Sequence, residues 1–186
     1  MKKLLFVLST AVLCFLSAAV MPACKEDDEP MVVEPTLYDT LGGTALVADP
    51  ANLGKMIEKG RLGIRSVVDS TIFVIAGDSR INGFFEVLLG EVTSGNLSGF
   101  QTLSNSLTDF FCVATGAKNF TYSGMNMVDA HNPAKNGRMK GKSNNAHFDA
   151  FIDDLVKGAK QNGLPDNIIG QVGALVETLR PQVVQQ

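Results

Sequence analysis

Hydrophobic positions recur at helical spacing in four stretches of the chain, and no stretch of any length alternates apolar and polar residues as a strand would. The four stretches cover residues 62–76, 100–114, 148–159 and 168–179. Apolar residues three and four positions apart lie on one face of a helix, and that face packs against a core. The pattern therefore predicts an all-α fold.

Residues 100–131 combine an apolar helix, a glycine break and a histidine. The helical stripe consists of Phe100, Leu103, Leu107, Phe110, Phe111 and Ala114. Gly116 is expected to end the helix, and His131, one of two histidines, follows. An apolar wall followed by one imidazole suits a buried, flat ligand that needs a nitrogen donor, and haem is such a ligand. A core histidine without a ligand is the competing interpretation.

This stretch also resembles the truncated (two-over-two) haemoglobins, group I in particular. The resemblance rests on Phe110-Phe111-Cys-Val-Ala-Thr-Gly116, Tyr122-Ser-Gly124 and Asp129-Ala-His131. Thr36-Leu-Tyr-Asp-Thr-Leu-Gly-Gly43 resembles the family's short first helix and its glycine turn. It implies a truncated globin fold over residues 36–186, with insertions at 44–60 and 132–143. The first insertion is compatible with a short helix around Leu53 to Glu58.

The resemblance implies one haem b, with His131 as the iron ligand. Phe84 or Phe85 would pack on the haem ring, and Ile72, Leu103 and Leu107 would form the distal side. The family usually has tyrosine at position 72 and often has glutamine on the distal helix, whereas these three side chains cannot donate a hydrogen bond. Ser104 and Ser106, which flank the stripe, are weak candidates for a donor.

Further cofactor contacts are expected from Phe111, Lys118, Tyr122 and Met127. For Met127, ordinary core packing is the alternative. Lys118 and the basic residues of the second insertion, Arg138, Lys140 and Lys142, could pair with haem propionates, although a solvated loop is the favoured interpretation. A backbone carbonyl in the preceding turn is the expected partner of the second His131 ring nitrogen, with Asp129 also close in sequence. His147 is expected to be structural or exposed.

The first 35 residues predict export and a lipid anchor. Lys2 and Lys3 precede an apolar run from Leu4 to Val20, which is typical of a signal peptide over residues 1–23. Met21-Pro-Ala-Cys24 resembles a lipobox, so Cys24 is expected to be lipidated, although an ordinary signal peptide and a solvated linker are the alternative. Residues 24–35 are acidic and predict a tether. They resemble a surface-export signal, so the expected location is the cell envelope, in the outer membrane, with display at the cell surface as a further alternative.

Composition excludes several classes of function. The formal net charge is −3, and no basic cluster suggests nucleic acid. Of three cysteines, Cys14 would leave with the signal and Cys24 would be lipidated, so Cys112 has no partner for an intramolecular disulfide. No CxxC, HExxH, GxGxxG or P-loop motif occurs. The chain is not predicted to be an enzyme, with NO dioxygenase or peroxidase-like activity as the alternative. NO dioxygenation needs bound oxygen and an electron source, and the sequence identifies neither.

Three functions remain open on the sequence. The first is a globin that binds a diatomic gas (oxygen, NO or CO) on haem. The second is a surface lipoprotein with a globin fold that has lost or repurposed the haem pocket and acts as a binding or scaffold module. The third is a surface protein that acquires haem. A visible spectrum of the purified protein discriminates best among them.

Overall fold

The four stretches with helical spacing all form helices in the computed structural model, which describes residues 34–186. They are α2 (Lys59–Gly77), α4 (Ser98–Ala114), α6 (Asn145–Gln161) and α7 (Asp166–Glu177). α7 ends before Leu179, which was expected to belong to it, and a separate short helix, α8 (Arg180–Val183), follows. The predicted signal peptide, Cys24 and nearly all of the acidic tether lie outside the described residues.

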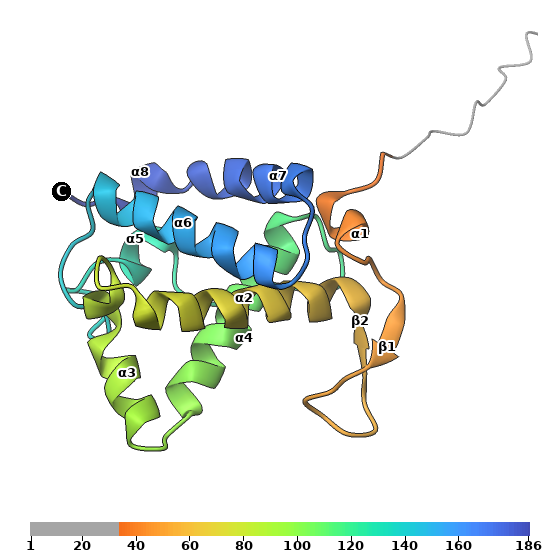
Figure 1. Cartoon of the computed structure of the whole chain (residues 1–186), viewed down its shortest axis with the longest axis horizontal. Helices are drawn as coiled ribbons and strands as arrows, with labels where there is room; N and C mark the ends of the chain where they lie inside the picture. The colour runs from red at the N-terminus through yellow and green to blue at the C-terminus, as the bar shows by residue number, and fades with distance from the viewer. Residues whose placement is uncertain (1–33) are drawn as a thin grey trace, which may run out of the picture. The chain divides into compact units, whose positions relative to one another are not determined.

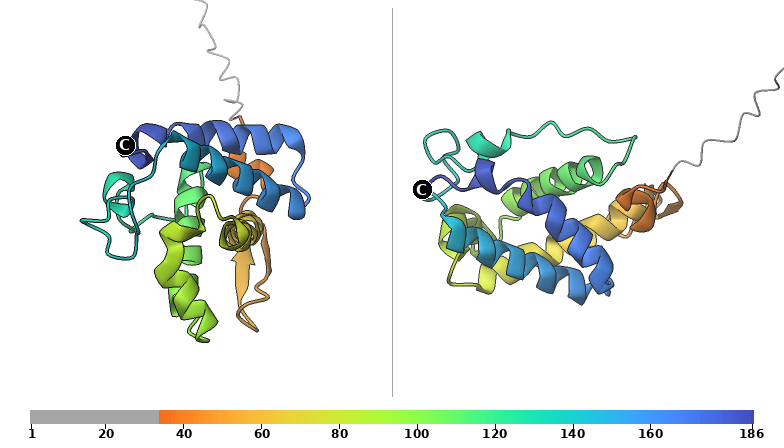
Figure 2. Two further views of the ribbon diagram at one scale, coloured as in Figure 1. Left: turned by 60° about the vertical axis from the view of Figure 1, so that its left-hand side comes forward. Right: turned by 90° about the horizontal axis from the view of Figure 1, so that it is seen from above.

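The long helices form two pairs that lie one over the other. α2 packs against α4 in one layer and against α6 of the other layer, while α7 runs beside α6 (Figures 1 and 2). The apolar faces of all four helices meet in one core, whose buried members include Ile64, Val68, Phe148, Leu155 and Val176. This arrangement is the two-over-two helical sandwich that the sequence predicts.

A glycine allows α2 and α6 to approach closely. A Cβ atom added at Gly158 of α6 would collide with the Thr71 hydroxyl and would lie 2.8 Å from the Thr71 backbone nitrogen on α2. Thr71 turns its hydroxyl to the Val67 carbonyl, at 2.8 Å, and so needs no partner on α6. Because the side chain of any other residue would push the helices apart, the layer contact depends on Gly158.

Short helices connect the long ones. α1 (Leu37–Thr40) begins at a Thr36 capping box and ends at Gly42 and Gly43, both with positive φ, as the sequence predicts. A 3₁₀ turn, η1 (Asn82–Phe85), leads into α3 (Glu86–Thr93), for which the sequence analysis assigned no element. α5 (Met127–Ala130) is a single turn that ends at His131. Among residues 34–186, no helix has the length and apolar character needed to cross a bilayer.

The first insertion forms a β-hairpin, so the helix considered around Leu53 to Glu58 is wrong. Strands β1 (Leu46–Ala48) and β2 (Met56–Glu58) pair antiparallel, with Val47 opposite Ile57. Each strand has only three residues, too few for alternation to be recognised in the sequence. The tip turns at Pro50 and at Gly54, where φ is 79°. These two residues disfavour a helix and fit a turn.

Candidate functional site

His131 presents one free ring nitrogen. Its Nδ1 lies 2.8 Å from the Met127 carbonyl oxygen, and a carbonyl can only accept, so Nδ1 carries the proton and Nε2 carries the lone pair. No described residue forms a hydrogen bond with Nε2. Burial lowers the pKa of His131, and the smaller effect of the Met127 hydrogen bond raises it. The ring is therefore a neutral imidazole, the form that binds metals.

The carbonyl partner expected for His131 is confirmed, and Asp129 has another role. Asn126 caps α5 by accepting a hydrogen bond from the Asp129 backbone N–H at 2.9 Å. Its side-chain amide donates to the Asp129 carboxylate at 2.7 Å. Asn126 and Asp129 thus stabilise the short helix as its cap. The imidazole is oriented by the Met127 carbonyl and not by Asp129.

The second insertion and the C-terminus hold α5 in place. Asn136 of the insertion donates to the Ala130 carbonyl at 2.8 Å. Gln185 donates to the Val128 carbonyl at 2.9 Å. Ser143, at the end of the insertion, donates to the Val183 carbonyl. One turn of helix is not stable by itself, so these contacts are what position His131.

The apolar stripe of α4 is only half covered by protein. The most buried face of α4 consists of Ser104, Thr108, Phe111 and Cys112, and Thr115 directly after the helix is also buried. α4 packs on α2. Phe100, Leu103 and Leu107 lie at the edge of the core and are half-buried. Small residues face α2 because the helices approach closely there. The large apolar residues therefore form a wall that the described residues only partly cover.

The structure gathers most of the predicted pocket residues at one core. Ile72 and Phe111 are buried in it, and Phe85, Leu103 and Leu107 pack against it. Phe84 belongs to a smaller adjoining cluster that it shares with Phe85. His147 caps α6 with Asn144 and packs edge-on to Phe84 at a centroid distance of 4.9 Å. The expectation that His147 is structural is confirmed.

The remaining predicted contacts are less concentrated. Tyr122 packs edge-on against Phe110 and donates to the Met125 carbonyl at 2.7 Å. Met127 is half-buried, and its carbonyl binds His131. Lys118 lies near Asp39 of α1, at the end of the domain away from α5 (Figure 1). Hydrogen bonds from Thr36 lower the pKa of Asp39, and the Lys118 charge adds a smaller lowering effect. This location gives no support to a propionate contact by Lys118.

Polar groups near the proposed distal side are few and are turned elsewhere. Ser104 donates to the Asp69 carboxylate at 2.5 Å, so its hydroxyl is engaged. Arg138 forms a two-point ion pair with Glu91 of α3. Thr108, which is not part of the apolar stripe, is fully buried, and its hydroxyl has no partner among the described residues. The recurrence of small residues at positions 104, 108, 112 and 115 is the signal that marks this buried face.

The described residues offer no alternative metal site. No group of three or more histidine, cysteine, aspartate or glutamate side chains comes together within residues 34–186. A surface pocket of about 620 Å³ lies between the end of α2 and α6, lined in part by Asp78, Arg80 and Lys157. None of the residues predicted to contact a cofactor lines it. His131 is the better candidate ligand because its Nε2 has no described partner and burial favours the neutral ring. The half-covered wall of α4 offers the apolar surface that a haem ring needs.

The architecture is that of the truncated haemoglobins, and the fold prediction is confirmed. The truncated haemoglobin of Tetrahymena pyriformis, solved in its Fe(III) form, superimposes with a TM-score of 0.58 at 22% identity, covering 82% of this chain and 100% of that one. No family model matches the chain. The sequence is 25% identical over 148 residues to a group 1 truncated haemoglobin of Tetrahymena thermophila, covering 79% of this chain and 93% of the relative. A group 1 truncated haemoglobin of T. pyriformis is 33% identical over 78 residues, 41% of this chain and 57% of the relative.

Proposed function

We propose that this chain is a haem-binding globin of the group 1 truncated type, and that it binds a diatomic gas. The observation that carries the proposal is the state of His131, whose neutral ring is oriented by the Met127 carbonyl and keeps Nε2 free. The resemblance to truncated haemoglobins in both sequence and fold supports it.

The residues present fit haem b. His131 would supply the axial nitrogen, and Phe84, Phe85, Leu103, Leu107 and Phe111 would supply apolar contacts. A haem packed on the partly covered wall of α4 would explain why these side chains are apolar although the protein itself does not bury them fully. Haem, when bound, supplies the iron that takes up the gas. The apolar residues exclude water, and the Met127 carbonyl fixes the imidazole plane.

The distal residues would favour gases that need no hydrogen bond. Ile72, Leu103 and Leu107 have no donor, and the Ser104 hydroxyl is engaged by Asp69. CO and NO would bind without penalty. Oxygen would lack a hydrogen bond worth ~1.5–3 kcal/mol, which corresponds to roughly ten- to a hundredfold in affinity.

We also propose that the globin is held at the cell envelope through lipid on Cys24. The support is the sequence pattern alone: a basic start, an apolar run from Leu4 to Val20, and Met21-Pro-Ala before Cys24. The acidic residues after Cys24 would then separate the domain from the bilayer. This location is compatible with an extracytoplasmic gas-binding protein.

Reconstitution with haem tests the proposed function. The wild type should show a strong Soret band and a higher melting temperature with haem than without it, because haem binds the folded state. His131→Ala should lose most of the band and most of the rise. His147→Ala is the matched control: it removes the hydrogen bond that the His147 ring accepts from the Asn144 backbone N–H and keeps the Asn144 cap of α6, so it should keep the band and the rise. If wild type and His131→Ala bind haem equally well, or if neither binds, a globin fold without haem function takes the place of this proposal.

A further inference from the structure

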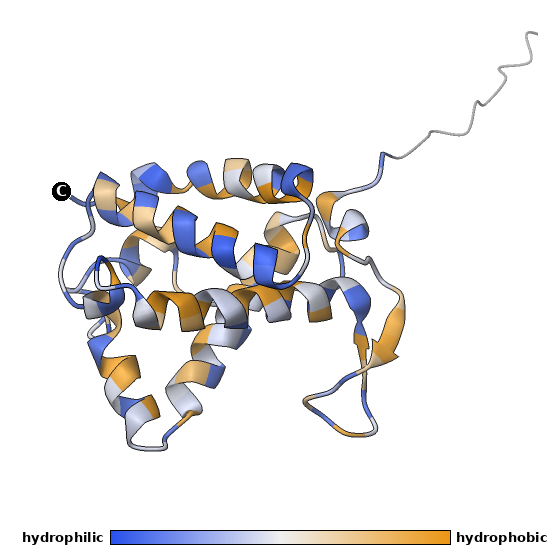
Figure 3. Cartoon of the chain, in the orientation of Figure 1, coloured by the Kyte–Doolittle hydropathy of each residue, from blue (hydrophilic) through white to orange (hydrophobic). Residues whose placement is uncertain are grey.

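The β1–β2 hairpin exposes large apolar side chains. Leu53 at the tip is 98% exposed, Leu46 on β1 is 62% exposed and Met56 on β2 is 59% exposed. The hairpin extends away from the helices, and its strands are largely coloured as hydrophobic (Figures 1 and 3). Isolated exposed apolar residues are ordinary, whereas three on one short hairpin form a patch that favours contact with another surface.

The tip of the hairpin is held by hydrogen bonds. The Asp49 carboxylate accepts from the Ala51 backbone N–H at 2.9 Å and from the Asn52 amide at 2.8 Å. Arg65 of α2 donates to the same carboxylate at 2.8 Å and holds the pKa of Asp49 well below its usual range. The tip is therefore fixed to α2, and Leu53 is kept away from the core.

The unpaired charges of the hairpin region are positive on balance. Asp49 is neutralised by Arg65, whereas Glu58 accepts a hydrogen bond from the neutral Tyr38 hydroxyl at 2.7 Å and keeps its charge. Lys55 and Lys59 are exposed and form no ion pair with another described residue. Behind the hairpin is a pocket of about 400 Å³, whose lining includes Leu46, Lys55, Met56, Arg61 and Arg65. Apolar and cationic side chains thus lie side by side.

We propose that this hairpin inserts Leu53 into the interface of an anionic lipid bilayer, with Lys55 and Lys59 on the headgroups. Apolar burial and attraction to anionic lipids together drive such interfacial binding. Three side chains are far fewer than the roughly 20–30 residues that each partner contributes to a stable dimer interface. A weak contact suffices for a chain already tethered to the bilayer. The inference rests on the proposed envelope location and is independent of haem.

Tryptophan fluorescence tests the insertion, because the chain contains no tryptophan. Leu53→Trp places a single reporter at the tip. Gln171→Trp is the control, since Gln171 is exposed on α7, which lies on the side of the domain opposite the hairpin. Each full chain is tethered by an N-terminal hexahistidine tag to vesicles that contain nickel-chelating and anionic lipids. The tag replaces the natural anchor, so a failure of the Cys24 proposal does not affect this measurement.

The Leu53→Trp emission should shift to shorter wavelength on the vesicles and should be quenched by lipids with brominated chains. The Gln171→Trp emission should show neither effect. Adding Lys55→Glu to Leu53→Trp should weaken the inserted state at least fivefold, since each lysine near an anionic surface contributes about that factor. An unshifted Leu53→Trp emission overturns the proposal, as does an equal shift in both variants. A shift that appears without vesicles as protein concentration rises would also overturn it, and would indicate a second copy on the hairpin.

Discussion

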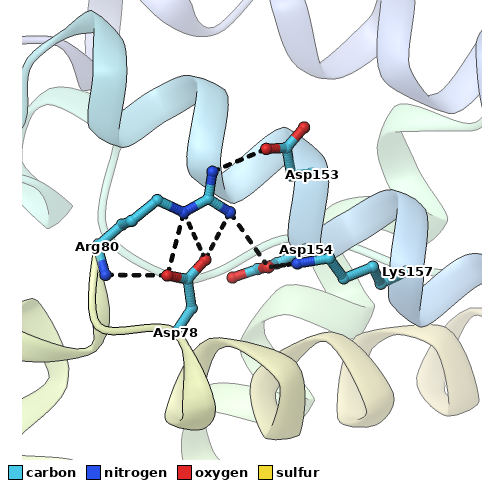
Figure 4. A network of polar contacts seen from close by, with 5 residues as sticks. All are labelled: Asp78, Arg80, Asp153, Asp154 and Lys157. Atoms are coloured by element: carbon cyan, nitrogen blue, oxygen red, sulfur yellow. Dashed lines mark hydrogen bonds and ion pairs between the residues drawn. The ribbon is translucent and has the colours of Figure 1, made fainter.

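A buried carboxyl group between α2 and α6 makes a stability prediction that depends on pH. Asp154 of α6 is 0% exposed, and its Oδ2 receives no hydrogen bond from a described donor. It lies against Asp78, the residue that ends α2, in the network of Figure 4. Burial raises the pKa of Asp154, whereas hydrogen bonds from Arg80 lower that of Asp78 to about 2. Asp154 therefore holds its proton to a higher pH than an exposed aspartate does, and we expect the protonated Oδ2 to bind Asp78.

Two substitutions at position 154 distinguish the contribution of the proton to stability from that of the rest of the side chain. Asp154→Asn keeps a donor toward Asp78 and should stay within about 1 kcal/mol of wild type at pH 5. Asp154→Ala removes a hydrogen bond to a charged group and leaves a small cavity, so it should cost about 2–3 kcal/mol. The ion pair of Asp154 with Lys157, at 3.0 Å, adds little because the Lys157 side chain is 56% exposed.

The pH dependence follows from the sign of the pKa shift. The folded state holds the Asp154 proton more tightly than the unfolded state, so this contribution is fully present below the ordinary carboxyl pKa. It is lost as pH rises through the raised pKa of the folded state, at no more than about 1.4 kcal/mol per pH unit. The amide introduced by Asp154→Asn does not titrate, so this variant should gain stability relative to wild type between pH 4 and pH 8.

Urea unfolding at several pH values measures these differences. Asp153→Asn is the control, because its carboxylate pairs with Arg80 at 2.8 Å on the surface, with an Asp153 side chain that is 58% exposed. The control should change stability little, because an exposed ion pair contributes little. A stability difference between Asp154→Asn and wild type that stays constant from pH 4 to pH 8 would refute the protonated Asp154. If Asp154→Ala were as stable as the wild type, the hydrogen bond between Asp154 and Asp78 would be refuted.

Three further predictions concern the fold, the distal side and the anchor. Gly158→Ala should lower the free energy of unfolding in urea by about 1–3 kcal/mol, because its methyl group would collide with Thr71. Gly170→Ala is the control: a Cβ there meets open space, so it should stabilise α7 by up to about 1 kcal/mol. Equal effects of the two variants would contradict the close approach of α2 and α6. Ile72→Tyr should slow oxygen dissociation from the ferrous protein by about tenfold or more, measured by stopped flow, since it adds a donor; a slow wild-type rate that the variant leaves unchanged would mean that another donor acts. Metabolic labelling with a fatty acid should mark wild type and not Cys24→Ala, and equal labelling would exclude the lipid anchor.

Much of the fold follows from local pattern. The periodicities of α2, α4, α6 and α7 predict these helices because an amphipathic helix needs only residues close in sequence to define its face. The capping of α1 by Thr36 and of α6 by Asn144 is local for the same reason. The resemblance in residues 100–131 predicted the fold and marked His131 as the candidate ligand.

Other features depend on contacts between distant residues. The strands of the first insertion are too short for a pattern, and they form because β1 and β2 pair and Arg65 holds the turn at Asp49. Similarly, α5 is one turn long and is positioned by Asn136 and Gln185. Such elements have little intrinsic stability, so local sequence does not reveal them.

The sequence by itself determined the helical class, the order of the long helices and His131 as the residue to test. Only the tertiary structure decided which face of α4 is buried. Helical spacing alone favoured the large apolar residues from Phe100 to Ala114, but the close contact with α2 admits small side chains, so Ser104, Thr108 and Cys112 lie inside. Burial depends on how closely a second helix approaches, and that distance is set by residues far away in the sequence.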